Sequence, residues 1–585
     1  MVRQKWFSWL LASLFSLLGL SLLAVALLPY GSMKAVFDLL AKDGDLEMLK
    51  PGNAIVFRLL VGAVGLVVLG FAYLTARRLW KAVVHFFGQL WADCRGFLTA
   101  PKDAKTEKGF LAAMLAVTLL GLIDRLAYLQ GPMLHDESYT VVTFADTLWH
   151  AITDYSLPNN HVLNTILINL SVRIFGLAVW SVRLPAFVAG VLLIPGVYFL
   201  AKRFYDSWTA LAASLLVAFS PMLVHYSTNA RGYTLVTLFT LLILGLADYV
   251  RRKRNLFAWG LISLFSALGL YTVPVMLFPF AIVFTWLFFE NLWAGPAAYS
   301  SKWAFFRYWL AAGLVAALLT ILFYTPILIF TGPQKLFANS FVAPVPWRDL
   351  LVTWHARLIE TWSEWIPGVP LVILLVLGIG IILSLAFHRK LSTSRVPLQL
   401  AALLAISALL IVQRPNAWSK VWVFLQPLLL IWAAAGTVGL LREIRLKFAR
   451  NISLAAVVVG AIFLAGLVGA ARIAPGLPGR WAAIGDVEAT TIYLKGQLQA
   501  NDYVVVDWPD DAPLWFYFLL HGIKNQHLDK NIPFTRALVL VEPVNGQTLE
   551  SVIADRGPDP GLLDTQNASR LTTIGIEQVF VCPRK

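Results

Sequence analysis

Residues 109–139 read GFLAAMLAVTLLGLIDRLAYLQGPMLHDESY, and the rest of the chain is organised around this stretch. It begins with a hydrophobic segment, residues 109–129, which is long enough to cross a bilayer as a helix. The adjacent carboxylates Asp136 and Glu137 follow it, where such a helix would reach the membrane surface. Either a solvated loop or an acid/base or metal site at the water–lipid boundary explains two acids there. The pair alone does not decide between these alternatives.

The composition defines the class of protein. The chain has 585 residues, of which 59% are hydrophobic and 14% charged, and its mean hydropathy is +0.72. Such a chain is a polytopic membrane protein. The net charge of +15 does not indicate nucleic-acid binding, because the basic residues form short clusters between apolar segments, as in cytoplasmic loops. Cys94 and Cys582 lie far apart and have no metal-ligand spacing, so we expect no disulfide between them.

The hydropathy pattern predicts about 13 transmembrane helices. We expect them at 6–28, 53–75, 109–129, 182–200, 207–226, 234–250, 256–273, 274–290, 308–330, 370–387, 397–412, 421–440 and 452–471. With the N-terminus in the cytoplasm, Lys and Arg residues on the cytoplasmic side outnumber those elsewhere before residue 472 by about two to one. This orientation places Arg251–Arg254 inside and the acid pair outside.

Residues 130–181 then form a long external loop. Within it, His161, Thr165 and Asn169 recur every four residues and give a helix over 161–174 a polar stripe. A membrane span would not carry this stripe readily, so we expect a helix on the outer surface, with His161 and Asn164 facing the acid pair. Another helix is expected around 138–153. A second external loop, 331–369, is rich in Trp, which is typical of an interfacial anchor and, less often, of a surface that stacks on sugars.

The C-terminal part, residues 472–585, loses the long apolar runs. Val504-Val505-Val506 and Leu538–Val541 are predicted strands, and residues 513–521 are a predicted helix. We interpret 472–585 as a small soluble α/β domain outside the membrane, with no catalytic constellation. His521 and His527 are lone histidines to which we assign no special role.

Several polar side chains should meet at the outer face under this topology. We predict Asp136 and Glu137 as catalytic groups, and His161, Asn164, His225, Arg231, Tyr233, Tyr271 and Lys420 as substrate-binding groups. A carboxylate that deprotonates an acceptor hydroxyl, beside a cation that stabilises a departing phosphate, suits sugar transfer from a lipid phosphate. A divalent metal on Asp136 and Glu137 is possible, but two acids without His or Cys at ligand spacing are weak support for it.

The order of short motifs from Asp136 to about Arg254 resembles a known family. After Asp136-Glu137 come Asn160-His161, Phe175-Gly176, Arg183-Leu184-Pro185-Ala186, Ser220-Pro221 and Ala230-Arg231-Gly232-Tyr233. Together they resemble the GT-C superfamily of polyprenyl-phosphate-sugar glycosyltransferases, in its protein O-mannosyltransferase and aminoarabinose-transferase branch. Lys420 to Pro427 resembles a basic-aromatic segment before a late helix of these enzymes.

The resemblance implies a GT-C fold and an inverting transfer on the outer face of the plasma (inner) membrane, with Asp136 as general base. It implies that Glu137 orients or assists, and that Arg231 and Lys420 contact the phosphate. Residues 109–471 would be the catalytic membrane domain, and residues 1–108 an added two-helix module. Many relatives have two prolines where Val162-Leu163 stand here, which puts the acceptor (protein, lipid or glycan) in doubt.

Other functions stay open at this stage. A flippase or transporter of lipid-linked glycans would place charged residues within spans and break helices at the midplane. A polysaccharide polymerase or ligase would share the external loop without the acid pair. A membrane scaffold that presents the domain 472–585 would leave the external polar cluster unexplained.

Overall fold

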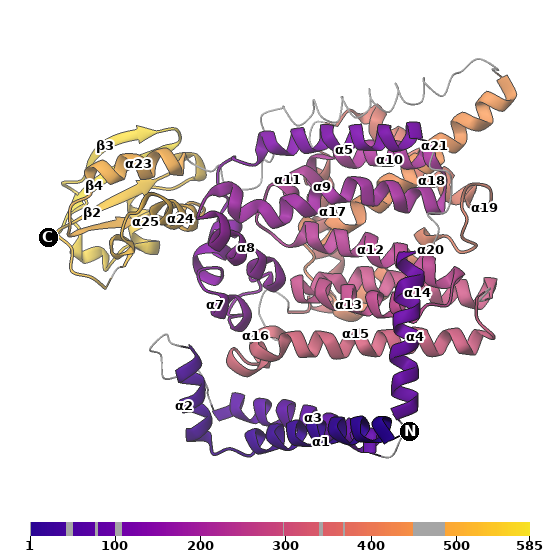
Figure 1. The fold of residues 1–585 in the computed structure, drawn as a ribbon. Coiled ribbons are helices and arrows are strands. Elements are labelled where there is room, and N and C mark those ends of the chain that lie inside the picture. The colour runs from indigo at the N-terminus through magenta and orange to yellow at the C-terminus, as the bar shows by residue number, and fades with distance from the viewer. Residues whose placement is uncertain are drawn as a thin grey trace.

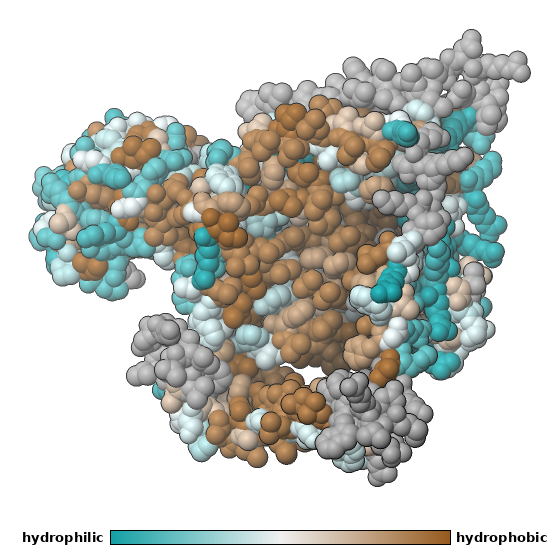
Figure 2. Space-filling model, in the orientation of Figure 1, coloured by the Kyte–Doolittle hydropathy of each residue, from teal (hydrophilic) through white to brown (hydrophobic). Residues whose placement is uncertain are grey.

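The computed structural model describes residues 2–41, 51–76, 80–99, 108–295, 298–337, 343–366, 369–448, 486–529 and 531–585. Its main body is a helical bundle, and a small domain with a β-sheet lies at one end of this bundle (Figure 1). Helices α5, α9 and α15 run across the bundle toward that end (Figure 1). On the face shown in Figure 2, the middle of the bundle is largely hydrophobic, whereas the small domain and the opposite end of the bundle are more hydrophilic. This contrast is expected for a membrane bundle that carries a water-exposed domain.

The helices follow the predicted spans closely. The bundle contains α5 (Lys108–Tyr128), α9 (Val179–Phe204), α10 (Ser207–Ala218), α11 (Pro221–Ser227), α12 (Tyr233–Arg252), α13 (Leu256–Thr272), η2 (Pro274–Met276), α14 (Leu277–Ala294), α15 (Lys302–Phe330), α18 (Leu371–Ala386), α20 (Leu398–Gln413), η5 (Ser419–Leu425) and α21 (Gln426–Phe448). With α1 and α3, these helices overlap the first twelve predicted ranges. The thirteenth range, 452–471, lies outside the described residues.

Fewer helices have the length and apolarity of a span than the sequence predicted. Among the described residues, seven helical segments are long and apolar enough to cross a membrane, or eight if α10 and α11 form one bent span. Five further apolar helices are shorter. The polytopic helical fold class is therefore confirmed, and the count of 13 is not.

The N-terminal helices form a separate layer beside the bundle. Helices α1 (Val2–Ala26) and α3 (Pro51–Ala76) pack side by side, with α2 (Tyr30–Ala41) between them in sequence (Figure 1). The Asn53 side chain donates a hydrogen bond of 2.9 Å to the carbonyl of Phe330 at the end of α15. Helix α4 (Trp80–Leu98) returns to the bundle, where Asp93 accepts from the backbone N–H of Leu256 at 2.6 Å.

A break between α10 and α11 shapes the polar end of the bundle. The two helices are bent by 62°, at a point where Pro221 cannot donate a backbone hydrogen bond. The buried Arg125 of α5 donates to the freed carbonyl of Ala218 at 2.8 Å and to Ser227 at 3.2 Å. Arg125 therefore has a structural explanation within its span, since it satisfies backbone groups that the break would leave without partners.

The segment after α5 folds into short helices at the end that carries the small domain. These are α6 (His135–Tyr139), the π-helix η1 (Thr140–Phe144), α7 (Leu148–Thr153) and α8 (Val162–Phe175). With 14 residues, α8 is about 21 Å long, too short for a span. Its polar stripe faces the protein interior, because Asn164, Thr165 and Asn169 are buried.

Between α15 and α18 lie α16 (Pro333–Phe337), η4 (Trp347–Asp349) and α17 (Leu350–Trp365), and α19 (His388–Leu391) follows α18. Trp347 and Trp362 are largely exposed, as expected of interfacial anchors. Arg357 of α17 stacks on the Trp418 ring, 3.4 Å from its centroid, so the Trp-rich segment is attached to the residue that precedes η5.

The C-terminal domain is an α/β fold. Its elements are α23 (Val487–Gln497), β1 (Asp502–Val505), α24 (Asp511–His521), η6 (Asn525–Leu528), β2 (Arg536–Val541), η7 (Pro543–Asn545), α25 (Leu549–Arg556), η8 (Pro560–Leu562), β3 (Ser569–Ile574) and β4 (Glu577–Pro583). The strand order is β1-β2-β4-β3, with β1 parallel to β2 and the other pairs antiparallel. The two predicted strands and the predicted helix are confirmed as β1, β2 and α24. Cys582 is buried and Cys94 partly buried, and both are free thiols.

Helix α24 attaches this domain to the bundle. The Tyr517 hydroxyl accepts a 3.2 Å hydrogen bond from the backbone N–H of Met133, and Asp511 lies 3.1 Å from His135 Nε2. Met133, Ile168 and Val182 of the bundle belong to the same hydrophobic cluster as Leu514 and Phe518. The domain therefore packs directly against the segment that contains the acid pair.

Candidate active site

Glu137 is fully buried and binds several donors at once. Its carboxylate forms an ion pair with Arg183 of α9 through both oxygens, with Nε 3.0 Å from Oε2. It also accepts from the backbone N–H groups of Leu134 at 3.0 Å and Ala230 at 2.8 Å. These contacts tie the start of α6 to α9 and to the loop after α11, and they leave no access for a substrate.

Asp136, the adjacent residue, has a different environment. Its side chain is 35% exposed, and Oδ2 lies 2.8 Å from Lys420 Nζ and 4.0 Å from Arg231 Nη2. Burial alone would raise the pKa of the Asp136 carboxyl, but the charges of Arg231 and Lys420 and hydrogen bonds from His135 and Lys420 hold that pKa well below its usual value. Asp136 is therefore an ionised, accessible carboxylate beside two cations.

Arg231 is held from several sides. It is 3% exposed, and its Nη1 donates to Thr140 Oγ1 at 2.8 Å and to the carbonyl of Asn159 at 2.9 Å. Its Nη2 lies 3.0 Å from Nε2 of His161. The guanidinium thus joins η1, the turn before α8 and the loop after α11 around Asp136.

His161 precedes α8 and is buried next to this cation. Its Nδ1 lies 2.8 Å from the backbone N of Gly232, while Nε2 faces Arg231. Burial, together with the charges of Arg231 and Lys420, lowers the pKa of the His161 imidazole well below its usual value. A neutral imidazole accepts at only one nitrogen, so one of these two N–H groups faces a ring N–H. His161 is therefore a neutral support for the loop 229–232.

The loop 229–232 connects most of the predicted residues. The carbonyl of Ala230 accepts from the Asn164 side chain at 3.0 Å, while the N–H of the same residue donates to Glu137. The ring of Tyr233 packs edge-on against His161, with the centroids 4.8 Å apart. The structure thus brings together Asp136, Glu137, His161, Asn164, Arg231, Tyr233 and Lys420.

Two predicted residues lie further from this cluster. Tyr271 packs in a separate aromatic group with Tyr155 and Tyr324, and its ring centroid lies 5.4 Å from that of Tyr324. His225 of α11 lies against Tyr226, with the ring centroids 5.0 Å apart.

The structure also adds residues that sequence reasoning missed. Arg183, the ion-pair partner of Glu137, is recognisable in the sequence only as part of the motif Arg183-Leu184-Pro185-Ala186. Glu364 of α17 is 8% exposed and accepts a hydrogen bond from the hydroxyl of Ser419, which immediately precedes Lys420. His135 lies between Asp136 and Asp511. The sequence signal for Glu364 was an acidic residue in an amphipathic segment rich in Trp.

A metal ion shared by Asp136 and Glu137 does not fit this arrangement. Both oxygens of Glu137 already accept from Arg183 and backbone N–H groups. The nearest charges to Asp136 are the cations Lys420 and Arg231, which would repel a further cation. Lys420 and Arg231 are instead suited to bind an anion beside Asp136.

The site is thus an accessible carboxylate beside two cations, at the polar end of a helical membrane bundle. Residues 162–319 match the family model described as dolichyl-phosphate-mannose-protein mannosyltransferase. A comparison with curated protein sequences gives no match. The family match agrees with the resemblance stated above from the sequence motifs, and it covers the segment from α8 into α15. The chain is therefore similar to GT-C membrane glycosyltransferases.

The solved structures that match this chain are distant from it in sequence. The chain is 13% identical to ArnT from Cupriavidus metallidurans in the apo state, covering 81% of this chain and 98% of that one with a TM-score of 0.48. For the same protein bound to undecaprenyl phosphate, the identity and coverage are the same and the TM-score is 0.49. The oligosaccharyltransferase from Archaeoglobus fulgidus, tethered to an acceptor peptide, is 13% identical with a TM-score of 0.40, covering 74% of this chain and 61% of that one.

Proposed function

We propose that this protein is a membrane glycosyltransferase that moves a sugar from a polyprenyl-phosphate donor to an acceptor hydroxyl, with Asp136 as general base. The observation that carries this proposal is the contact of one accessible carboxylate with two cations, Lys420 at 2.8 Å and Arg231 at 4.0 Å. The match of residues 162–319 to a mannosyltransferase family model supports it.

The chemistry follows from this pairing. The acceptor oxygen attacks the anomeric carbon as its proton passes to Asp136, and the bond from that carbon to the phosphate oxygen breaks. The polyprenyl phosphate leaves with the bonding electrons, and Lys420 and Arg231 stabilise its charge. A single displacement of this kind inverts the anomeric centre.

The two cations would also set the strength of the base. In the free site they keep Asp136 ionised and lower its pKa, so it is a weak base. A donor phosphate would compete for the same cations and raise the pKa of Asp136. The carboxylate would then accept a proton most readily when a donor is bound. Glu137 is a positioning residue in this scheme, because its carboxylate is buried against Arg183.

The outer face of the plasma membrane is part of the proposal. The segment 135–139, the C-terminal domain and Lys420 all lie at one end of the bundle in the predicted orientation, opposite to Arg251–Arg254. The donor sugar and the acceptor are left to experiment. A flippase is less favoured, since Arg125, a charged residue within a span, has structural partners at the α10–α11 break.

The direct test is transfer by the purified protein from a panel of polyprenyl-phosphate sugars. Asp136→Asn should reduce transfer by about 100- to 10,000-fold while folding is unchanged, because the amide keeps the shape but cannot accept the proton. Asp146→Asn is the matched control, since Asp146 is exposed nearby and pairs only locally with His150. Transfer at the wild-type rate by Asp136→Asn would refute the mechanism.

A further inference from the structure

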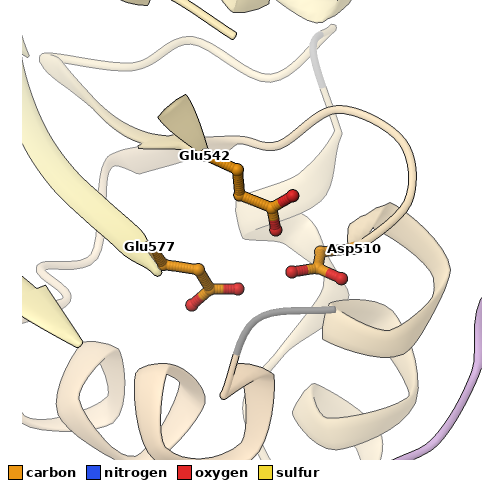
Figure 3. Close-up of side chains that lie close together, drawn as sticks. All are labelled: Asp510, Glu542 and Glu577. Carbon is orange, nitrogen blue, oxygen red and sulfur yellow. The ribbon is translucent and has the colours of Figure 1, made fainter. Parts of the chain in front are cut away.

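Three carboxylates converge in the interior of the C-terminal domain. Asp510 precedes α24, Glu542 follows β2 and Glu577 begins β4 (Figure 3). One carboxylate oxygen from each of the three lies within 4.8 Å of the other two, and the residues are 1%, 3% and 0% exposed. Like charges this close and this deeply buried destabilise a fold unless protons or a cation neutralise them.

The outer oxygens of the two glutamates accept from donors outside the cluster, whereas the inner oxygens face the other carboxylates. Glu577 Oε2 accepts from the hydroxyl of Thr490, and Glu542 Oε2 accepts from the side-chain amide of Asn545. The other oxygen of each, Oε1, is buried and has no donor outside the three acids among the described residues, and both glutamates interact with Asp510. Figure 3 shows the glutamate carboxylates directed toward Asp510 and toward one another. Neither glutamate forms an ion pair with a basic residue in the described part of the chain.

The spacing and the donor type fit a hard divalent cation. Oxygen ligands at 2.3–2.6 Å from Ca²⁺ lie at most about 4.6–5.2 Å apart, and the three carboxylates meet this limit. All ligand atoms are carboxylate oxygens, which Ca²⁺ and Mg²⁺ prefer over softer metals. Burial, together with a side-chain hydrogen bond to Asp510 and the charge of Asp510, raises the pKa of Glu577 to about 9, as expected for an acid among other acids with no counter-charge.

We propose that Asp510, Glu542 and Glu577 form a binding site for one divalent cation of the Ca²⁺/Mg²⁺ type. The ion would join the start of α24 to the ends of β2 and β4. The next residue of α24, Asp511, contacts His135 beside Asp136, and Tyr517 contacts Met133. The cation would therefore fix the helix that attaches the C-terminal domain to the candidate active site, although binding itself does not depend on the proposed transferase function.

The test measures metal binding and stability in the full-length chain, purified in detergent and stripped with EDTA. After Ca²⁺ or Mg²⁺ is added back separately and the excess is removed by desalting, wild-type protein should retain one ion per chain, as measured by elemental analysis, and the comparison shows which ion is preferred. A saturating cation, at about 100 times its dissociation constant, should raise the unfolding midpoint of the C-terminal domain by about 10 °C.

Two variants keep the proposal falsifiable. Glu542→Gln/Glu577→Gln should bind no cation and gain no stability from it, yet in EDTA it should be at least as stable as wild type because the repulsion is reduced. Glu550→Gln, an exposed acid of α25, should behave as wild type. Equal binding by the double variant would place the cation elsewhere. If wild type bound no cation and did not respond to either ion, the carboxylates would share protons instead, and the proposal would be wrong.

Discussion

At the scale of single residues, the adjacent acids Asp136 and Glu137 have opposite environments. Asp136 is 35% exposed beside Lys420, whereas Glu137 is buried against Arg183. The sequence identified both acids and several of their neighbours, but it could not tell which acid is accessible. That depends on Arg183 and on the N–H of Ala230, which lies 93 residues further along the chain.

Glu137→Gln separates a positioning role from a catalytic one. Removing one partner of a buried ion pair costs about 3–5 kcal/mol, so we expect a large fall in thermal stability together with lower activity. Glu137→Gln/Arg183→Gln should recover part of this stability, because no charge then remains unpaired. A stable Glu137→Gln variant that had lost only its turnover would show instead that Glu137 takes part in the chemistry.

Lys420 should affect both the binding of the sugar donor and the pKa of Asp136. Lys420→Met removes a charge-assisted hydrogen bond worth about 1.5–3 kcal/mol, so we expect donor KM to rise by about 10- to 100-fold. Since Lys420 lowers the pKa of Asp136, the acidic limb of the pH profile of kcat/KM should also move to higher pH. Lys335→Met is the control, because Lys335 is an exposed lysine of the same predicted external side. An unchanged acidic limb would show that Lys420 does not act on Asp136.

At the scale of elements, the sequence predicted helices better than their contacts. Hydropathy and periodicity identify α5, α9, α12 and α24 because these signals are local. The break between α10 and α11 was missed, although Ser220-Pro221 was the available signal. The acidic cluster of the C-terminal domain was missed as well, because the pairing of β2 with β4 brings together Glu542 and Glu577 from distant parts of the chain.

The contact between α6 and α24 should depend on pH. Burial lowers the pKa of His135, but hydrogen bonds to Asp136 and Asp511 outweigh this effect and raise the pKa to about 9. A group whose pKa is higher in the folded state contributes stability in full below its unfolded value, about 6.5, and loses it as pH rises through 9. The unfolding midpoint of wild type should therefore fall between pH 6.5 and 9 more steeply than that of His135→Gln. Parallel curves for the two proteins would contradict this role.

At the scale of the whole molecule, the polar site and the basic cluster lie at opposite ends of one helix. Helix α12 begins at Tyr233, beside His161, and ends at Arg252 after 20 residues, or about 30 Å. At its far end, the buried Asp248 accepts from Arg203 and Arg251. This length equals the hydrocarbon thickness of a bilayer, so a spanning α12 would place the polar site and the basic cluster on opposite sides of the membrane.

Labelling of engineered cysteines tests this orientation. After Cys94→Ser and Cys582→Ser remove the free thiols, a cysteine at the exposed position of Asp146 should react with an impermeant maleimide added to intact cells. A cysteine in place of Lys253, which follows α12, should react only after the membrane is permeabilised. Because three predicted spans, formed by α9, by α10 with α11 and by α12, separate the two positions, the results should be opposite. Labelling of position 253 from outside would invert the orientation and place Asp136 and Lys420 on the cytoplasmic side. The proposed transfer would then have to use a donor presented inside the cell.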